Sequence, residues 1–206
     1  MLKIIFLNDD FLIGRGGGRV CYIHPNDETK VIKITYSDEG RTNSQNSIDF
    51  KYINYIKELN KDLSHISSCY EYIETNLGTG LVFDRIVNYD KTPSKSFRYF
   101  IAKKLISLEV QKELLDELNE YLKKEEILFV DNSSTNILCQ EIEKGKYKLI
   151  IIDGLGAKRI GPKFWLYLKF KFYRDYKIKK QWIKFMDSYK KDLKRIDLNK
   201  NPITRF

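Results

Sequence analysis

The sequence predicts an α+β fold in two lobes: a small β-rich N-terminal lobe and a mainly α-helical C-terminal lobe. Short β-branched and apolar runs separated by turn residues fill the first half, whereas apolar residues at helical spacing fill the second. Runs of strands followed by runs of helices are typical of this class. A polar link over residues 90–96 marks the change, and we place the lobes at residues 1–87 and 88–206.

The composition is that of a folded globular protein in a reducing compartment. The 206 residues are 42% hydrophobic and 32% charged, and no apolar run approaches the roughly 20 residues that span a bilayer. The short N-terminal apolar run meets Asn8 at once, so we expect no signal peptide. Cys21, Cys69 and Cys139 are odd in number and widely spaced, which is typical of reduced thiols and not of a zinc site. These features predict a cytoplasmic protein.

In the first half, the predicted strands cover residues 2–7, 19–23, 30–36, 69–74 and 80–87. The residues from His24 to Asp27 are strong turn formers, and a loop is expected over residues 37–47. One helix follows that loop, because apolar side chains recur there at helical spacing. Its apolar face comprises Ile48, Tyr52, Tyr55, Ile56 and Leu59.

The second half is expected to hold two long amphipathic helices on either side of a hairpin. A loop over 131–135 precedes the hairpin, which covers 137–152 and turns at Lys144-Gly145. The first helix is marked by Val110, Leu114, Leu118, Tyr121 and Leu122. The terminal helix is marked by Ile178, Trp182, Phe185, Met186, Tyr189, Leu193 and Ile196.

A glycine cluster and a strand lysine are the first candidates for chemistry. The cluster over residues 14–18 would let backbone N–H groups approach a phosphate, because glycine has no Cβ in the way. Lys33 lies on the strand that follows and could reach the same phosphates. The alternatives are an ordinary Gly-rich hairpin turn and a lysine that faces solvent.

A second cluster of polar residues brackets the predicted hairpin. Asp131 and Asn136 fit the pattern D-x-x-x-x-N, and Asp153 ends the apolar run over 149–152 just before Gly154. With a turn at Lys144-Gly145, Asn136 and Asp153 would lie opposite each other with Cβ atoms about 5 Å apart. An amide oxygen and a carboxylate in that arrangement suit Mg²⁺. A bulge would shift this register, and the alternative is that these residues only shape turns.

The order of these parts resembles that of the protein-kinase superfamily. More closely, nearly the whole chain resembles the YrbL family, described as part of the PhoP regulatory network in bacteria. The motifs that carry this resemblance are Ile13-Gly14-Arg15-Gly16, Cys21-Tyr22-Ile23-His24-Pro25, Ile32-Lys33-Ile34, Gly78-Thr79-Gly80, Val82-Phe83-Asp84 and Asn136-Ile137-Leu138-Cys139.

The resemblance implies an ATP site in the N-terminal lobe. Gly14 and Gly16 would cover the phosphates, and Lys33 would contact the α- and β-phosphates and take part in catalysis. Asp49 would pair with that lysine in place of the usual glutamate. Phe83 and Asp84 would lie in the hinge near adenine.

In the C-terminal lobe the resemblance implies a catalytic base and a metal site. Asp131 would accept the proton of an attacking hydroxyl, while Asn136 and Asp153 would hold Mg²⁺. The chain departs from the kinase pattern at Arg19, at Phe129-Val130 where His-Arg is usual, and at Ser133 and Gly154, and no Ala-Pro-Glu follows.

The departures leave two functions open. The segment between Asp153 and Pro162 is short for a protein-substrate platform, which favours a small-molecule or lipid-linked acceptor for an ATP-dependent phosphotransferase. The alternative is a pseudokinase-type module that binds nucleotide for regulation in a bacterial stress or two-component network. The sequence does not decide whether the protein is an enzyme.

The C-terminal part is strongly basic. Residues 158–206 carry 16 Lys and Arg against four Asp and Glu, a net charge of +12, while the whole chain carries +9. Aromatic residues alternate with these lysines, a pattern typical of segments that bind an anionic membrane or, less favoured here, nucleic acid. This would add peripheral contact with the inner membrane to the cytoplasmic location. The alternative is that the aromatic stripe packs inside the lobe while its lysines face water.

Overall fold

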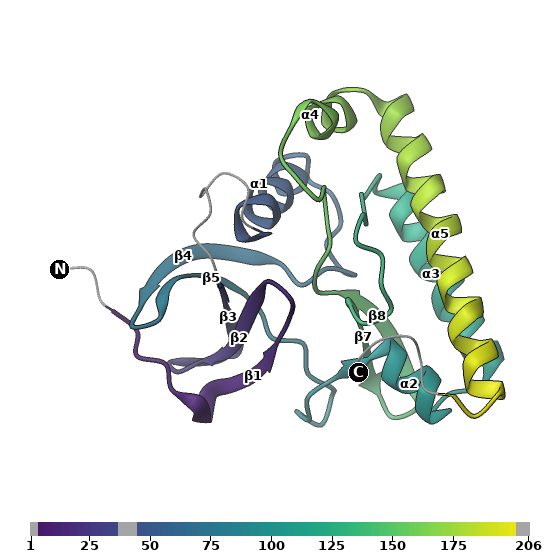
Figure 1. The fold of residues 1–206 in the computed structure, drawn as a ribbon, viewed down its shortest axis with the longest axis horizontal. Coiled ribbons are helices and arrows are strands. Elements are labelled where there is room, and N and C mark those ends of the chain that lie inside the picture. The colour runs from purple at the N-terminus through teal and green to yellow at the C-terminus, as the bar shows by residue number, and fades with distance from the viewer. Residues whose placement is uncertain (1–3, 37–44, 201–206) are drawn as a thin grey trace. The chain divides into compact units, whose positions relative to one another are not determined.

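The computed structural model describes residues 4–36 and 45–200, and it confirms the α+β class (Figure 1). The chain forms two compact units. Unit 1 takes its residues from Met1–Leu63, Ser67–Arg85 and Lys158–Ile160. Unit 2 takes its residues from Ser64–Ile66, Ile86–Ala157 and Gly161–Phe206. Among the described residues, no helix has the length and apolarity that crossing a bilayer requires.

Unit 1 is built on a five-stranded antiparallel sheet with the strand order β1-β2-β3-β5-β4. A 3₁₀ turn, η1, precedes β1 at Asp9–Phe11. The strands are β1 (Leu12–Arg15), β2 (Arg19–His24), β3 (Asp27–Thr35), β4 (Cys69–Thr75) and β5 (Gly78–Asp84). The turn expected after His24 joins β2 to β3, and the turn at Asn76-Leu77 joins β4 to β5.

The two faces of this sheet are covered differently. On one face, buried apolar side chains of the strands pack with Leu7. On the other face lies helix α1 (Gln45–Glu58), which contacts β3, β4 and β5. Its side chains Ile48, Tyr52, Ile53 and Ile56 are almost fully buried. Because neighbouring side chains of a strand alternate between faces, Lys33 of β3 lies on the α1 face.

Two strand predictions for this unit need correction. Of the strand expected over residues 2–7, residues 2 and 3 lie outside the described part. Residue 5 forms only an isolated bridge to Thr75 of β4. The strand expected to continue to residue 87 ends at Asp84, because the backbone N–H groups of Asp84 and Arg85 turn to Ser68 and Thr29. Of the loop expected over 37–47, residues 37–44 are not described, and the last three residues already belong to α1.

Unit 2 combines a small antiparallel sheet with four helices. Its strands pair in the order β6 (Lys95–Ser96), β7 (Ile137–Glu143) and β8 (Lys146–Ile151). Lys144 and Gly145 form the turn between β7 and β8, as the sequence predicted. The helices are α2 (Phe97–Lys103), α3 (Leu108–Lys124), α4 (Pro162–Lys169) and α5 (Lys171–Asp197).

Helix α5 packs against the other helices of unit 2. It contacts α2, α3 and α4, and it buries Ile178, Phe185 and Tyr189. Gln181 and Asp192 are buried on the same helix, which apolar periodicity did not reveal. The sequence also missed α2, because seven residues are too few to show a helical repeat. Helix α2 is fixed instead by the Ser96 side chain, which accepts a hydrogen bond from the Tyr99 N–H at its start.

Candidate functional site in two parts

The segment that carries Asp131 lies directly against the segment that carries Asp153. The backbone N–H groups of Val130 and Asp131 both donate to the Gly154 carbonyl, at 2.8 and 3.0 Å. Gly154 has φ of +85°, and a Cβ at this position would lie 2.7 Å from the Asp131 carbonyl oxygen. Only glycine permits both this backbone conformation and this close approach. The close approach therefore brings two parts of the expected site together.

The Asn136 side chain closes the loop that Asp131 opens. Its Nδ2 donates to the Asp131 carbonyl at 2.8 Å, with a longer contact of 3.4 Å to Asp131 Oδ2. Ser133 N–H also donates to the Asp131 carbonyl, at 2.9 Å. Because the amide nitrogen of Asn136 is used inside the loop, its Oδ1 oxygen is the atom that can act as a ligand.

Asp153 completes this group of oxygen atoms in unit 2. Its Oδ1 accepts a hydrogen bond of 2.6 Å from Gly154 N–H. Asp131 is exposed, whereas Asn136 and Asp153 are half-buried. The structure thus gathers Asp131, Asn136 and Asp153 around one loop junction.

The predicted register of the hairpin is wrong by one residue. Glu143 pairs with Lys146 as expected, but a bulge between Glu141 and Glu143 shifts every pair beyond it. Ile152 N–H therefore donates to the Asn136 carbonyl, and Asp153 does not lie directly opposite Asn136. Both side chains still lie near Asp131, because Gly154 packs on the Asp131 backbone and the Asn136 side chain donates a hydrogen bond to the Asp131 carbonyl.

The oxygen donors of this locality fit Mg²⁺ only together with further ligands. Among the described residues there is no group of three or more His, Cys, Asp and Glu side chains that could hold a metal ion. Two carboxylates and one amide oxygen are the kind of donor set that Mg²⁺ uses when phosphates and water supply its remaining ligands. Asn136 and Asp153 would hold such an ion, and it would neutralise charge on bound phosphates.

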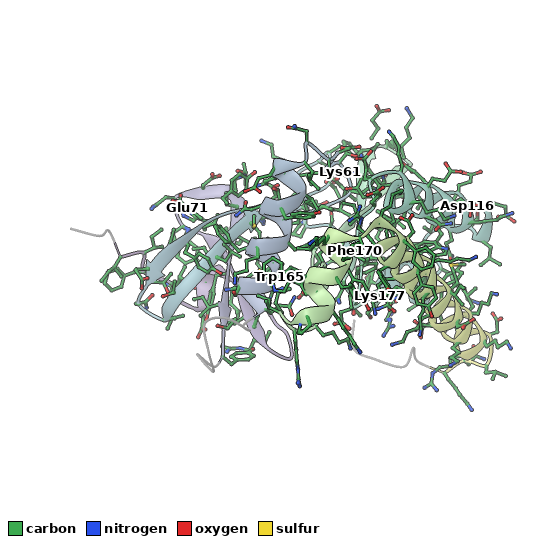
Figure 2. The ribbon with its side chains drawn as sticks, turned by 90° about the horizontal axis from the view of Figure 1, so that it is seen from above. Lys61, Glu71, Asp116, Trp165, Phe170 and Lys177 are labelled. Carbon is green, nitrogen blue, oxygen red and sulfur yellow. The ribbon has the colours of Figure 1, made fainter. Side chains whose placement is uncertain are left out.

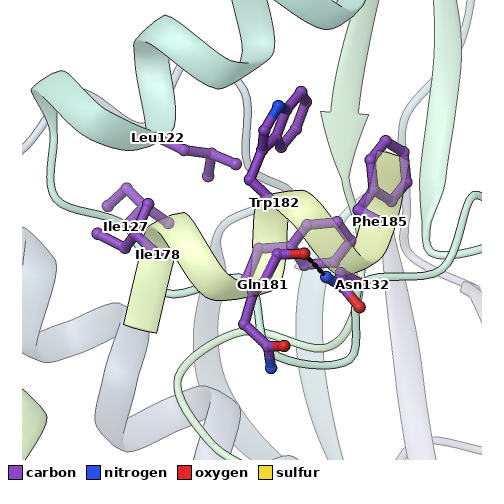
Figure 3. A pocket seen from close by; sticks show the side chains of 8 residues that line it. Leu122, Ile127, Asn132, Ile178, Gln181, Trp182 and Phe185 are labelled. Atoms are coloured by element: carbon purple, nitrogen blue, oxygen red, sulfur yellow. Dashed lines mark hydrogen bonds between the residues drawn. The ribbon is translucent and has the colours of Figure 1, made fainter. Parts of the chain in front are cut away.

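The loop is fixed by residues that the sequence analysis did not single out. Gln181 Nε2 donates to the Val130 carbonyl at 2.9 Å, and Asn132 Nδ2 donates to the Gln181 carbonyl (Figure 3). Helix α5 thereby bonds to the residues on both sides of Asp131. The cavity beside this contact, shown in Figure 3, measures only about 10 Å³, so it is packed core and no ligand site.

Arg98 of α2 holds the same loop from another helix. Its Nε donates to Ser134 Oγ at 2.9 Å, and its Nη2 lies 3.1 Å from Oδ2 of Asp192 in α5. Arg98 and Asp192 are 3% and 0% exposed. Burial lowers the pKa of Arg98, and the charge of Asp192 opposes that shift. A buried ion pair thus ties α2, α5 and the loop together.

In unit 1, residues 16–18 of the glycine cluster join β1 to β2, and Gly14 lies within β1, a strand that the sequence analysis did not predict. Gly16 N–H donates to the Arg19 carbonyl at 2.7 Å, which closes the turn. A Cβ at Gly14, Gly17 or Gly18 would meet no atom within 4 Å. The described residues therefore leave open space beside these three glycines, although Gly14 pairs with Cys21 in the sheet and the Gly18 carbonyl accepts from Tyr36 N–H.

Lys33 is buried on the α1 face of the sheet. It is 7% exposed, lies opposite Cys21 and Leu81 in the ladder, and has its Nζ 4.1 Å from the centroid of the Phe83 ring. A lysine is rarely buried to this degree. The alternative of a solvent-facing strand lysine is therefore wrong for this residue.

Asp49 of α1 has a partner that the sequence analysis did not foresee. Its Oδ2 lies 2.7 Å from Arg19 Nη1, and both side chains are buried. The same guanidinium nitrogen donates to Asn46 Oδ1 at 2.8 Å. Arg19 was noted only as a departure from a glycine pattern, although an arginine on an otherwise apolar strand signals a buried partner. The expected pairing of Asp49 with Lys33 stays a prediction.

Phe83 and Asp84, the expected hinge residues, are engaged within unit 1. Phe83 is 1% exposed. The Asp84 carboxylate accepts from Lys30 Nζ and Tyr70 Oη, both at 2.7 Å, and its backbone N–H and C=O bond to Ser68 and Ser67. Contact of these two residues with adenine stays a prediction, and hydrogen bonds from Asp84 would require some of these contacts to open.

Within the described part of the chain, the three cysteines form no disulfide bond. Cys69 and Cys139 are buried, and Cys21 is half-buried. Burial raises the pKa of Cys69 to about 11 and that of Cys139 to about 12. Both therefore stay protonated at neutral pH, which makes them poor nucleophiles and poor metal ligands.

Comparison with known proteins decides the family. The family model described as "PhoP regulatory network protein YrbL" matches residues 5–190. The chain belongs to the YrbL family. The YrbL proteins of Escherichia coli (strain K12) and Shigella flexneri are each 29% identical to it over 161 residues, which is 77% of this chain and 77% of theirs.

The family match covers residues of both units. It includes the glycine cluster, Lys33, the Asp131 loop and Asp153. It also includes most of α5, with Gln181. The geometry described above therefore lies inside the part of the chain that this YrbL-family protein shares with its family.

Proposed function

We propose that this YrbL-family protein is a kinase-like, Mg²⁺-dependent ATP phosphotransferase that acts on a small-molecule or lipid-linked acceptor. The observation that carries the proposal is the close packing of Gly154 on Asp131, which gathers Asp131, Asn136 and Asp153. Phosphoryl transfer uses one residue that accepts the proton of the attacking hydroxyl and others that hold the metal ion, and these three residues could supply both.

Unit 1 would supply the groups that bind the phosphates. The space beside the glycine turn would let its backbone N–H groups approach an anion, and Lys33 would offer a buried positive charge. A phosphate bound near Lys33 would be stabilised by the positive charge of its ammonium group. These features support nucleotide binding independently of the loop in unit 2.

In the proposed reaction, Asp131 accepts the proton of the acceptor hydroxyl. The hydroxyl oxygen then bonds to the γ-phosphorus, the bond from that phosphorus to the bridging oxygen breaks, and ADP carries the electron pair away. Asn136 and Asp153 would hold the Mg²⁺ that neutralises the phosphate oxygens. Asp131 is exposed, so its proton can pass to water after the transfer.

A regulatory nucleotide-binding module is the second candidate. Phe129-Val130 stands where active kinases carry His-Arg, and Ser133 Oγ bonds to Thr135 Oγ1 at 2.7 Å instead of offering a cationic side chain. Such a protein would bind ATP without turnover. The two candidates share the nucleotide site and differ only in the role of Asp131.

The first experiment is a thermal-shift titration with ATP, with and without Mg²⁺. We expect MgATP to raise the melting temperature, because ligand at 100 times its Kd stabilises by about 2.7 kcal/mol, or roughly 5–11 °C for a chain of this size. Asp153→Asn should lose the Mg²⁺-dependent part. Asp116→Asn is the matched control, since Asp116 is exposed on α3 (Figure 2).

The outcomes separate the candidates. No shift of the unsubstituted protein at millimolar MgATP would refute both, and an equal loss in Asp116→Asn would remove the role of Asp153. If binding is found, Asp131→Asn should keep the shift. ATP hydrolysis or transfer that disappears in Asp131→Asn supports the enzyme, whereas binding without any turnover in the unsubstituted protein supports the regulatory module.

A further inference from the structure

Five aromatic side chains are exposed where α4 meets α5. They are between 45% and 77% exposed, and they are Trp165, Phe170, Phe172, Tyr173 and Tyr176. We call these five residues the aromatic corner. Helix α4 ends at Lys169 and α5 begins at Lys171, so the chain turns there within one residue (Figure 1). Trp165 and Phe170 lie along this turn, with Lys177 further along α5 (Figure 2).

The structure divides the aromatic stripe of the C-terminal segment into two parts. Phe164 of α4 and Ile178, Phe185 and Tyr189 of α5 are buried inside unit 2. The aromatic corner is not, although it belongs to the same pair of helices. A patch of large exposed aromatic side chains indicates a surface that binds a protein, a membrane or a ligand.

The rings of the corner contact one another and the lysines around them. Tyr173 packs edge to face against Phe170 and Phe172, with centroids 6.3 and 5.7 Å apart. Lys169 Nζ lies 5.6 Å from the Phe170 ring, and Lys180 Nζ lies 5.8 Å from the Tyr176 ring. Phe170, Phe172 and Tyr173 therefore form one cluster of rings, with an ammonium group beside Phe170 and another beside Tyr176.

The charge around the corner is positive and only partly neutralised. Residues 162–184 contain seven Lys and one Arg against a single Asp. Glu126 holds Lys171 and Arg174, and it raises the pKa of Lys171. Five lysines make no ion pair with any residue in the described part of the chain. These are Lys163, Lys169, Lys179, Lys180 and Lys184.

A groove between α3 and α5 adjoins the corner. Its volume is about 570 Å³. Its lining is formed by Asn119, Lys123, Lys171, Asp175, Ile178, Lys179, Trp182 and Ile183, and Asp175 is paired with Lys171. At 100° per residue, Phe172, Tyr176, Lys179 and Ile183 fall within an arc of about 60° on α5. The groove and the corner are therefore neighbouring parts of one helix face, and the groove is lined by three lysines, one aspartate and apolar side chains.

We propose that the aromatic corner and this groove bind the surface of an anionic lipid bilayer. The rings would enter the interfacial layer, where amphipathic aromatic side chains are favoured. The lysines would contact headgroup phosphates while their alkyl stems cover apolar surface. The groove would take an anionic headgroup at its lysines and the adjoining acyl carbons along Ile178 and Trp182.

The same observations disfavour a single-stranded nucleic acid. Bases stack on the open faces of aromatic rings, but Tyr173 packs edge to face against both of its neighbours. Arginine is the residue that matches phosphates in a bidentate manner, and the only arginine over 162–184 is held by Glu126. The apolar side chains of the groove, Ile178, Trp182 and Ile183, would pack against a lipid acyl chain.

The test is co-sedimentation of the full chain with vesicles of phosphatidylcholine containing about 30% phosphatidylglycerol, and with vesicles of phosphatidylcholine alone. We expect binding to the anionic vesicles only, weakening as salt is raised. Phe172→Ser with Tyr176→Ser should lower the partition coefficient about ten-fold or more. The matched control is Phe6→Ser with Tyr89→Ser, which also removes one exposed Phe and one exposed Tyr.

A second pair of substitutions tests the proposal independently, in case the Phe172→Ser and Tyr176→Ser variant does not fold. Lys169→Gln with Lys180→Gln should weaken binding to anionic vesicles, whereas Lys112→Gln with Lys144→Gln, on exposed sites elsewhere in unit 2, should change it little. Equal binding to both kinds of vesicle, or equal loss in test and control variants, would overturn the proposal. Tighter binding of a single-stranded oligouridylate, lost in the Phe172 and Tyr176 variant, would assign the surface to nucleic acid instead.

Discussion

Gly154 shows how one residue shapes the candidate site. Its φ of +85° is a conformation that side-chain-bearing residues adopt at a cost, and the Asp131 carbonyl occupies the place where a Cβ would be. The glycine was visible in the sequence as the neighbour of Asp153. Its contact with Asp131 was not, because 23 residues separate them and only the folded hairpin brings them together.

We expect Gly154→Ala to lower the free energy of unfolding by about 2–4 kcal/mol, from backbone strain and from the clash with Asp131. Gly145→Ala is the matched control, because Gly145 also has positive φ, +76°, but has no atom within 4 Å of a Cβ. It should cost only about 1–2 kcal/mol. Urea unfolding followed by tryptophan fluorescence measures both, and equal losses would show that the close approach does not matter.

At the same scale, the sequence identified Lys33, Asp131, Asn136 and Asp153 as candidates but misjudged some of their surroundings. Arg19 forms an ion pair with Asp49, and the bulge in β7 moves Asp153 off the register expected with Asn136. Both differences have one cause. Partner choice and bulges depend on packing between segments that are distant in the chain, and spacing along the chain does not encode them.

Among the secondary-structure elements, α5 links the basic C-terminal segment to the Asp131 loop. Gln181 bonds to Val130 and Asn132, and Asp192 holds Arg98, which bonds to Ser134. Apolar periodicity predicted α5 correctly as a helix. It could not show that two polar residues on the buried face fix a loop, because a hydrophobic pattern carries no information about polar partners.

Asp192→Ala should lower the free energy of unfolding by about 3–5 kcal/mol, because it leaves the buried guanidinium of Arg98 without its counter-charge. Asp187→Ala on the same helix is the control, since Asp187 is exposed, and it should stay within about 0.5 kcal/mol. Chemical denaturation of the two variants decides this. A loss below about 1 kcal/mol for Asp192→Ala would mean that the ion pair does not stabilise the helix arrangement.

At the scale of the whole molecule, the residues that the proposed function uses belong to two different compact units. Unit 1 would supply the glycine turn and Lys33, and unit 2 would supply Asp131, Asn136 and Asp153. The basic charge is concentrated in unit 2, mostly on α4 and α5. The two proposals, nucleotide binding and bilayer binding, rest on different residues and are tested by separate experiments.

If the proposed function is right, MgATP should slow amide hydrogen exchange in both units at once. We expect protection over residues 14–24 in unit 1 and over 130–136 in unit 2, because ligand contacts reduce local opening. The Asp153→Asn variant should lose the Mg²⁺-dependent protection. Protection confined to one unit would contradict a site that uses both, even if the melting temperature rises.

The sequence by itself determined the α+β class, the main strands and long helices, the hairpin turn at Lys144-Gly145 and the candidate residues of the Asp131 loop. These features follow from local periodicity, turn chemistry and short motifs, which operate over a few neighbouring residues. The tertiary structure alone decided that Gly154 packs on Asp131, that Gln181 and Arg98 hold the loop, and that the aromatic corner stays exposed while Phe185 and Tyr189 are buried. Burial and polar partnership arise only when segments distant in the chain meet.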